Sequence, residues 1–99
     1  MATYMDPEGL ETAAVAKLVP SFANLRVLEI GCGDGRLTRR YAEAAASVLA
    51  IDPDEAAVAR FRLTMPDALR GHVELRAAPL EALDLPRASF DLAIFAWSL

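Results

Sequence analysis

The sequence has one cysteine among its 99 residues, no excess of basic charge and no long apolar run. A single cysteine forms no internal disulfide, so nothing in the chain requires an oxidising compartment. Ten basic residues against 14 acidic ones give a net charge of −4, which argues against a nucleic-acid-binding module. No stretch approaches the roughly 18 apolar residues of a membrane span, and residues 1–20 lack the basic-then-apolar pattern of a secretion signal. These absences predict a cytoplasmic protein with no nucleic-acid or membrane partner.

The composition is that of a globular chain, with 55% hydrophobic and 24% charged residues. Ninety-nine residues suffice for one domain at most, so we expect a single unit over 1–99. The basic residues are scattered except for Arg36, Arg39 and Arg40, which we interpret as the solvated side of a helix.

Short apolar runs alternate with helical patterns along the chain. Runs typical of buried parallel strands occur around residues 27–30, 47–51, 73–78 and 90–96. Amphipathic helical patterns cover residues 8–18, 35–46 and 55–65, and Asp54 is placed to cap the last of these helices. Strands alternating with helices predict an α/β fold, a parallel sheet with flanking helices.

A loop with three glycines follows the first predicted strand. In LEIGCGDGRLT, residues 28–38, the glycines are Gly31, Gly33 and Gly35. The dinucleotide-binding fingerprint is G-x-G-x-x-G, so the third glycine comes one residue early and Arg36 stands in its place. Glycine permits backbone to approach a ligand closely, but the pattern does not by itself decide which ligand.

Two acidic residues lie at this loop. Glu29 ends the strand beside the expected ligand crevice, and Asp34 lies within the loop. Carboxylates here oppose the phosphate that helix N-termini attract, and they suit a ligand with a positive charge, such as an ammonium or a sulfonium. The alternative is that Glu29 merely accepts backbone hydrogen bonds within the loop.

A further carboxylate, Asp52, follows the second predicted strand, about twenty residues after the first glycine. At that position a carboxylate can accept hydrogen bonds from both hydroxyls of a ribose. The alternative is a turn residue that ends the strand before Pro53. Taken together, the acids predict a site for a ribose beside a cationic group.

Residues 25–99 resemble the class I S-adenosylmethionine-dependent methyltransferases. VLEIGCGDGRLT is similar to their first motif, VLAIDPDEAAVARF to their second, and VELRAAPLEALDLPRASFDLAIFAWSL to their third and fourth. The E-x-G-C-G-x-G loop is closest to the small-molecule branch of the family. The resemblance implies a Rossmann-like sheet with strand order 3-2-1-4, the first part of a longer 3-2-1-4-5-7-6 arrangement.

The resemblance also implies S-adenosylmethionine as cofactor and assigns roles in the first two motifs. Glu29 would orient the methionine amino end, directly or through water. Gly31, Cys32 and Gly33 would pass their backbone along the methionine portion, and Cys32 would be a small space-filling residue rather than a nucleophile. Asp52 would bind the ribose, and the adjacent Pro53 would contact the adenine edge.

The sequence departs from the family after the third predicted strand. An acid that binds the adenine amino group is common there, but this chain has Pro79. Leu80 can still offer its backbone N–H to the purine, and Phe95, near the end of the fourth strand, is the remaining expected cofactor contact. Glu81 is a possible substitute for the missing acid, although a surface acid is the favoured interpretation.

Two other residues are candidates for the site. His72 precedes the third predicted strand, away from the crevice, and is interpreted as a loop histidine with no chemistry. Trp97 lies just after the fourth strand, where it would either line the methyl-acceptor pocket or belong to the core. No metal is expected, because displacement at a sulfonium needs none.

The resemblance describes the cofactor half of a larger domain. Residues that select and align a methyl acceptor would lie mainly in later strands, so the catalytic residues are unknown and we expect a fragment that is inactive alone. The acceptor is expected to be a small molecule. The alternatives are a non-catalytic S-adenosylmethionine-binding or interaction module and a nicotinamide-dependent reductase.

The fourth predicted strand also carries an expectation about assembly. FDLAIFA, residues 90–96, has no proline or lysine, and its charge is limited to Asp91. Without a fifth strand beside it, its backbone would form an exposed edge. The sequence therefore predicts a homodimer through the exposed fourth strand.

Overall fold

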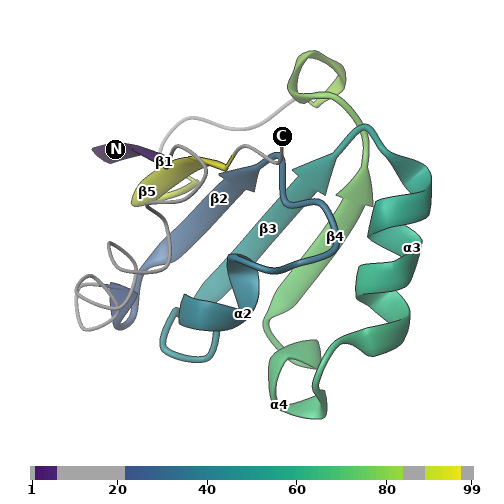
Figure 1. Cartoon of the computed structure of the whole chain (residues 1–99). Helices are drawn as coiled ribbons and strands as arrows, with labels where there is room; N and C mark the ends of the chain where they lie inside the picture. The colour runs from purple at the N-terminus through teal and green to yellow at the C-terminus, as the bar shows by residue number, and fades with distance from the viewer. Residues whose placement is uncertain (1, 7–21, 84–88, 97–99) are drawn as a thin grey trace.

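The computed structural model describes residues 2–6, 22–83 and 89–96. A five-stranded sheet lies at its centre, and every neighbouring pair of strands is parallel. In chain order the strands are β1 (Ala2–Asp6), β2 (Arg26–Ile30), β3 (Ser47–Asp52), β4 (Val73–Ala77) and β5 (Leu92–Ala96). The arrowheads of β2, β3 and β4 end at the same edge of the sheet (Figure 1), where ligands bind in open α/β sheets.

The four predicted strands and their order are confirmed. They are β2, β3, β4 and β5, and they lie in the order β4-β3-β2-β5, which is the expected 3-2-1-4. Leu28 in β2 lies opposite both Leu49 of β3 and Ala93 of β5. The central strands are thus hydrogen-bonded on both sides and buried, as their continuous apolar runs require.

The strand β1 was not predicted, and it corrects the expectation of an open edge at β5. It pairs in parallel with β5, from Ala2 opposite Leu92 to Asp6 opposite Ala96. The argument for a homodimer through an exposed fourth strand is therefore wrong, because the backbone of β5 already has an intramolecular partner on that side. A segment of five residues without an alternating pattern gives no signal of a strand. Its partner β5 lies far along the chain, with Ala2 opposite Leu92.

The helical elements described are α2 (Thr38–Tyr41), α3 (Glu55–Thr64), α4 (Asp67–Arg70) and the 3₁₀ turn η2 (Leu80–Ala82). The predicted α3 and its cap are confirmed: the Asp54 carboxylate accepts hydrogen bonds from the backbone N–H groups of Ala56 and Ala57, at 3.0 and 3.1 Å. The helix expected over 8–18 lies outside the described residues.

Helix α2 is shorter than the predicted 35–46 segment. After Tyr41 the chain continues in turns, with the Ala44 N–H bonded to the Tyr41 carbonyl. The Ala44 carbonyl in turn accepts the Asn24 N–H, and Leu25 accepts the Ala46 N–H. These tertiary bonds engage backbone groups that a continued helix would have paired internally, which explains why α2 stops after one turn.

The two faces of the sheet are covered differently. On one face, side chains of the strands pack with Leu37, Tyr41, Val58, Phe61 and Leu69 of the helical segments in the main core. The other face carries a smaller cluster of Leu28, Leu49, Ile51 and Ala93, against which the η2 region packs. Among the described residues, every helix is too short to cross a membrane.

Candidate functional site

The glycine loop connects the end of β2 to α2 at the carboxyl edge of the sheet. All three glycines have left-handed backbone, with φ of 86° at Gly31, 55° at Gly33 and 92° at Gly35. Other residues rarely adopt these angles. The loop therefore requires glycine for its path before any ligand is considered.

The space beside the three glycines differs. A Cβ at Gly31 would overlap the carbonyl oxygen of Ala96, at the end of β5, and a Cβ at Gly35 would lie 2.5 Å from the Phe61 ring. A Cβ at Gly33 would meet nothing within 4 Å. Gly31 and Gly35 are thus accounted for by packing inside the protein, whereas Gly33 borders open space that a ligand can occupy.

Four N–H groups of the loop donate hydrogen bonds to other groups of the protein. Those of Gly31 and Cys32 donate to the Ile51 carbonyl, at 2.8 and 3.0 Å. The Gly33 N–H donates to Oδ2 of Asp52 at 2.9 Å, and that of Gly35 donates to the Cys32 carbonyl. A phosphate-binding loop directs such donors at the anion. These four donors are already engaged, which disfavours the pyrophosphate of a dinucleotide.

Asp52 ends β3 beside this loop and is partly exposed. Its Oδ2 holds Gly33, and its Oδ1 accepts the Asp54 N–H at 2.8 Å. The turn role considered from the sequence is therefore present. An ionised carboxylate offers about four lone-pair positions, so two backbone bonds leave Asp52 able to accept further hydroxyl donors, and its ribose role stays a prediction.

Glu29 lies deeper than the sequence suggested. Its side chain is 0% exposed, and Oε1 accepts the hydroxyls of Thr38 at 2.8 Å and Tyr41 at 2.5 Å. Burial, and then the nearby Glu29 carboxylate, raise the pKa of Tyr41 well above its ordinary value. Oε1 of Glu29 is thus bonded to two side chains of α2, an arrangement that neither interpretation of the sequence included.

Cys32 is buried within the loop, with its thiol directed to the Gly33 carbonyl. Burial, together with the negative charges of Glu29 and Asp52, raises the pKa of this thiol. A thiol held in its protonated form is a poor nucleophile. This environment is consistent with the space-filling role predicted for Cys32.

The residues expected around adenine lie after β3, after β4 and within β5. Pro53 is exposed directly after β3, and Pro79 precedes the η2 turn that Leu80 begins. Phe95 forms the last residue pair between β5 and β2, opposite Ile30, and is partly buried. Glu81 is exposed, as the surface interpretation of that acid requires.

The remaining candidates lie outside the loop site. The ring of His72 is bonded through Nε2 to the Ala42 carbonyl at 2.8 Å, at the amino end of β4, in agreement with a histidine that has no chemical role. Arg39 and Arg40 are exposed on α2, as predicted, whereas Arg36 is exposed but lies in the turn before that helix. Trp97 lies outside the described residues.

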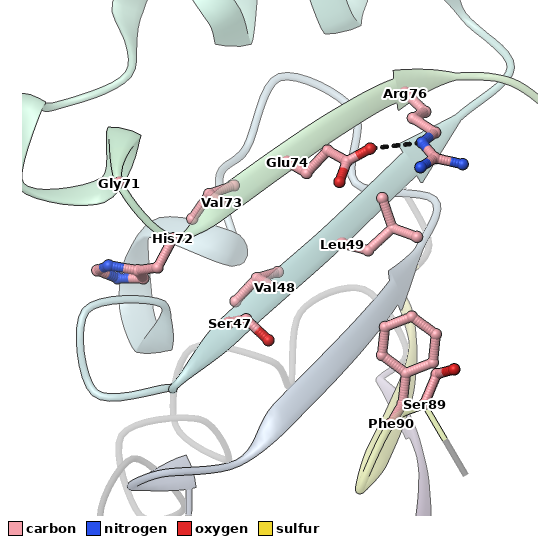
Figure 2. Close-up of a pocket in the computed structure, with 10 residues that line it drawn as sticks. All are labelled: Ser47, Val48, Leu49, Gly71, His72, Val73, Glu74, Arg76, Ser89 and Phe90. Atoms are coloured by element: carbon pink, nitrogen blue, oxygen red, sulfur yellow. Dashed lines mark hydrogen bonds and ion pairs between the residues drawn. The ribbon is translucent and has the colours of Figure 1, made fainter. Parts of the chain in front are cut away.

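Two hollows can be compared with this site. A small one of about 40 Å³ borders the glycine loop and includes Gly33, Asp34 and Ala96 in its lining. A larger one of about 460 Å³ lies over β3 and β4, where Ser47, Leu49, Glu74 and Arg76 line it together with Phe90 (Figure 2). The larger hollow contains none of the predicted cofactor residues, and the Arg76 guanidinium is paired with Glu74 there.

Thr38 and Tyr41 are the residues of this site that the sequence reasoning missed. Both lie in α2 and are nearly fully buried, at 0% and 1% exposure. Their signal in the sequence was a hydroxyl at each of two positions one helical turn apart, on the face that packs on the sheet. This pattern indicates a role in the site only when a buried hydrogen-bond acceptor such as Glu29 lies beside it.

The sequence is similar to a known protein family and to named relatives. Residues 27–99 match a family described as "Methyltransferase domain". A ubiquinone biosynthesis O-methyltransferase of Bradyrhizobium is 33% identical over 81 residues, covering 80% of this chain and 30% of the relative. A probable S-adenosylmethionine-dependent methyltransferase of Mycobacterium tuberculosis is 40% identical over 78 residues, covering 79% and 27%. The chain therefore spans less than a third of these relatives.

Solved structures show the same similarity. An S-adenosylmethionine-dependent methyltransferase from Mesorhizobium loti has a TM-score of 0.72 and 35% identity, over 89% of this chain and 39% of that one. The magnesium protoporphyrin IX methyltransferase of Synechocystis, solved with bound SAM, has a TM-score of 0.69 and 26% identity, over 86% and 41%. The β4-β3-β2-β5 sheet and its helices are thus a methyltransferase-like fold.

Proposed function

The chain belongs to the methyltransferase domain family, and from this premise we propose that it is the cofactor-binding portion of an S-adenosylmethionine-dependent methyltransferase. The observation that carries the proposal is the pairing of Gly33 with Asp52. Gly33 borders open space, and its N–H is held by a partly exposed carboxylate at the carboxyl edge of the sheet. A close backbone approach beside a hydroxyl acceptor suits a nucleoside that carries no phosphate.

The residues present fit this cofactor better than a nicotinamide dinucleotide. The inward-facing N–H groups of Gly31, Cys32 and Gly33 leave these three donors unavailable to a pyrophosphate. Asp34 adds an exposed carboxyl at the loop, which opposes an anion and attracts a cation. We therefore place the reductase alternative behind the methyltransferase.

The roles proposed for the chain's own residues are binding and orientation. Asp52 accepts the ribose hydroxyls, and Gly33 allows the ligand to pass close to the backbone. Pro53, Leu80 and Phe95 border the purine, with the N–H of Leu80 at the start of a turn that does not use it internally. The cofactor, when bound, supplies an activated methyl group and its leaving group, so this half requires no nucleophile or metal.

The methyl acceptor is proposed to be a small molecule. The relatives named above include a ubiquinone biosynthesis O-methyltransferase and a magnesium protoporphyrin IX methyltransferase, and both names refer to small molecules. Alignment of an acceptor can contribute about 7–11 kcal/mol to lowering a barrier. We propose that residues beyond this cofactor half supply that alignment, and that the 99-residue chain alone transfers no methyl group.

Isothermal titration of the chain with S-adenosylhomocysteine and, separately, with NAD tests the cofactor. We expect saturable binding of S-adenosylhomocysteine and none of NAD at the same concentrations. Binding of NAD alone would reinstate the reductase alternative. A parallel assay of labelled methyl transfer to a panel of small phenols and amines separates the inactive half-domain from a complete enzyme, and measurable transfer would overturn the proposed inactivity.

A further inference from the structure

The two ends of the glycine loop are joined by side chains beneath it. Glu29 is the penultimate residue of β2, and Thr38 is the first residue of α2. The Thr38 hydroxyl donates to Oε1 of Glu29 at 2.8 Å, and the Tyr41 hydroxyl donates to the same oxygen at 2.5 Å. These bonds close the loop at its base, so that all three glycines lie between the bonded residues.

From this geometry we propose that Glu29, Thr38 and Tyr41 are positioning residues that anchor the glycine loop, and that Glu29 acts on the cofactor through the loop. The inference rests on the proposed function for the identity of the ligand. It assigns Glu29 a different task from the direct or water-mediated contact with the methionine amino end that its place in the motif implied.

Burial is the first reason for this assignment. All three side chains are almost completely removed from solvent, at 0%, 0% and 1% exposure. A buried carboxyl group is tolerated only when hydrogen-bond donors compensate its desolvation. The two hydroxyls serve as such donors at Oε1, and removing them would take that compensation away.

The conformational freedom of the loop is the second reason. Three left-handed glycines within five residues form a segment that loses much entropy when it is held in one path. Tyr41 is itself fixed, because its ring stacks on Phe22 with centroids 4.5 Å apart and planes 20° apart. A rigid hydroxyl from α2 therefore determines where the start of the loop lies relative to its end.

The anchor and the direct contact predict different responses to substitution. Glu29→Gln keeps an oxygen that can accept both hydroxyls but removes the charge that would attract an ammonium. Thr38→Val and Tyr41→Phe keep the shape and remove only the hydroxyls. If Glu29 anchors the loop, Glu29→Gln should weaken ligand binding less than the loss of both hydroxyls does. If Glu29 contacts a cation of the ligand directly, Glu29→Gln should weaken binding more.

Amide hydrogen exchange of the free chain is the first measurement. In the double variant Thr38→Val/Tyr41→Phe, we expect exchange of the Gly33 and Gly35 amides to become about tenfold faster or more, the scale of one hydrogen bond to a charged group. The Ala50 amide, in the middle of β3, should exchange at the rate set by global unfolding. Thr64→Val is the matched control, because it removes an exposed hydroxyl of α3 that bonds to Arg60 and Arg39.

Ligand affinity is the second measurement, with S-adenosylhomocysteine and adenosine as probes. We expect the double variant to weaken both by a similar factor of about tenfold, and Glu29→Gln to affect the two equally. Unchanged loop exchange in the double variant would overturn the anchor. So would a selective loss of S-adenosylhomocysteine affinity in Glu29→Gln, which would mark a direct contact with the amino acid end.

These two measurements also separate this inference from the proposed function. The exchange experiment uses no ligand, so it tests the anchor whatever the chain binds. Failure of the unsubstituted chain to bind S-adenosylhomocysteine would count against the proposed function alone. If the double variant unfolds the chain, the single variant Tyr41→Phe carries the same comparison, with Thr38→Ser as the conservative control that keeps the hydroxyl at position 38.

Discussion

Gly35 lies against the tip of the Phe61 ring, so that a Cβ at this glycine would come within 2.5 Å of Cζ and 2.6 Å of both Cε atoms. This relationship joins the glycine loop to α3, because Phe61 is fully buried in the main core. The third glycine therefore serves the packing of a helix near the loop, a use also known in dinucleotide-binding folds. Gly35 has this packing role although it comes one residue earlier than the third glycine of the dinucleotide-binding pattern.

Substitution of Gly35 should accordingly cost more stability than substitution of Gly33. We expect Gly35→Ala to lower the free energy of unfolding by roughly 2–4 kcal/mol, because left-handed strain adds to overpacking against Phe61. Gly33→Ala bears only the strain, about 1–2 kcal/mol. Urea unfolding of the two variants measures the difference. Equal losses would contradict the role of Phe61.

Gly33 should instead matter for the ligand. Asparagine adopts left-handed backbone more readily than alanine, so Gly33→Asn is expected to fold while placing a side chain in the open space beside the loop. We expect its affinity for S-adenosylhomocysteine to fall by about tenfold or more, on the scale of 1.4 kcal/mol or greater. Titration calorimetry provides the measurement, and unchanged affinity would show that the ligand does not pass this glycine.

Asp52 and Asp54 provide a matched pair of carboxylates two residues apart. Asp52→Ala should weaken S-adenosylhomocysteine binding by roughly 1–3 kcal/mol, the cost of a lost hydrogen bond to a charged group. Asp54→Ala removes the α3 cap and should lower stability by about 0.5–2 kcal/mol with affinity unchanged. Calorimetry and thermal unfolding on both variants test the division of roles. Equal affinity of Asp52→Ala and the unsubstituted chain would remove the ribose assignment.

Asp91 should give the stability of the chain a distinct acid dependence. Arg26 donates to Asp91 through its backbone N–H and through Nε and Nη2, at 2.9–3.1 Å. These bonds lower the pKa of Asp91 from 3.8 to about 2. A carboxylate whose pKa is lowered by folding stabilises the native state above its unfolded pKa. This contribution should therefore be complete above about pH 4 and disappear as the pH falls through about 2.

The measurement is the difference in unfolding free energy between the unsubstituted chain and Asp91→Asn, followed from pH 5 to pH 2. Other carboxyl groups titrate in both proteins, so their contributions cancel in the difference. We expect the difference to narrow steadily over this range, and to be smaller in high salt because the pair is exposed. A difference that is independent of pH would contradict the ion pair.

Cys32 should be unreactive in the folded chain. Its thiol is buried and its pKa is raised, so at pH 8 little thiolate is available to attack an alkylating reagent. We expect reaction with iodoacetamide to be at least about 100-fold slower in buffer than in denaturing urea, since it requires local opening. Rapid modification of the folded chain would place Cys32 in an exposed loop instead.

Local patterns in the sequence were sufficient for much of this fold and for part of the site. The β2, β3, β4 and β5 segments are apolar runs of the length of buried strands, and α3 carries its own cap in Asp54. Both signals lie within a few neighbouring residues, where periodicity and capping chemistry act directly. The loop glycines were evident for the same reason, since left-handed backbone is a property of single residues.

The pairings between distant segments were decided only by the tertiary structure. The β1 segment forms a strand because it pairs with the free edge of β5. Helix α2 ends early because the Ala44 carbonyl, in the turn that follows, accepts a hydrogen bond from the Asn24 N–H. The partners of Glu29 were likewise invisible, because Thr38 and Tyr41 reach its carboxyl group only once α2 packs on the sheet. Hydrogen bonds of this kind depend on positions in space that no spacing along the chain specifies.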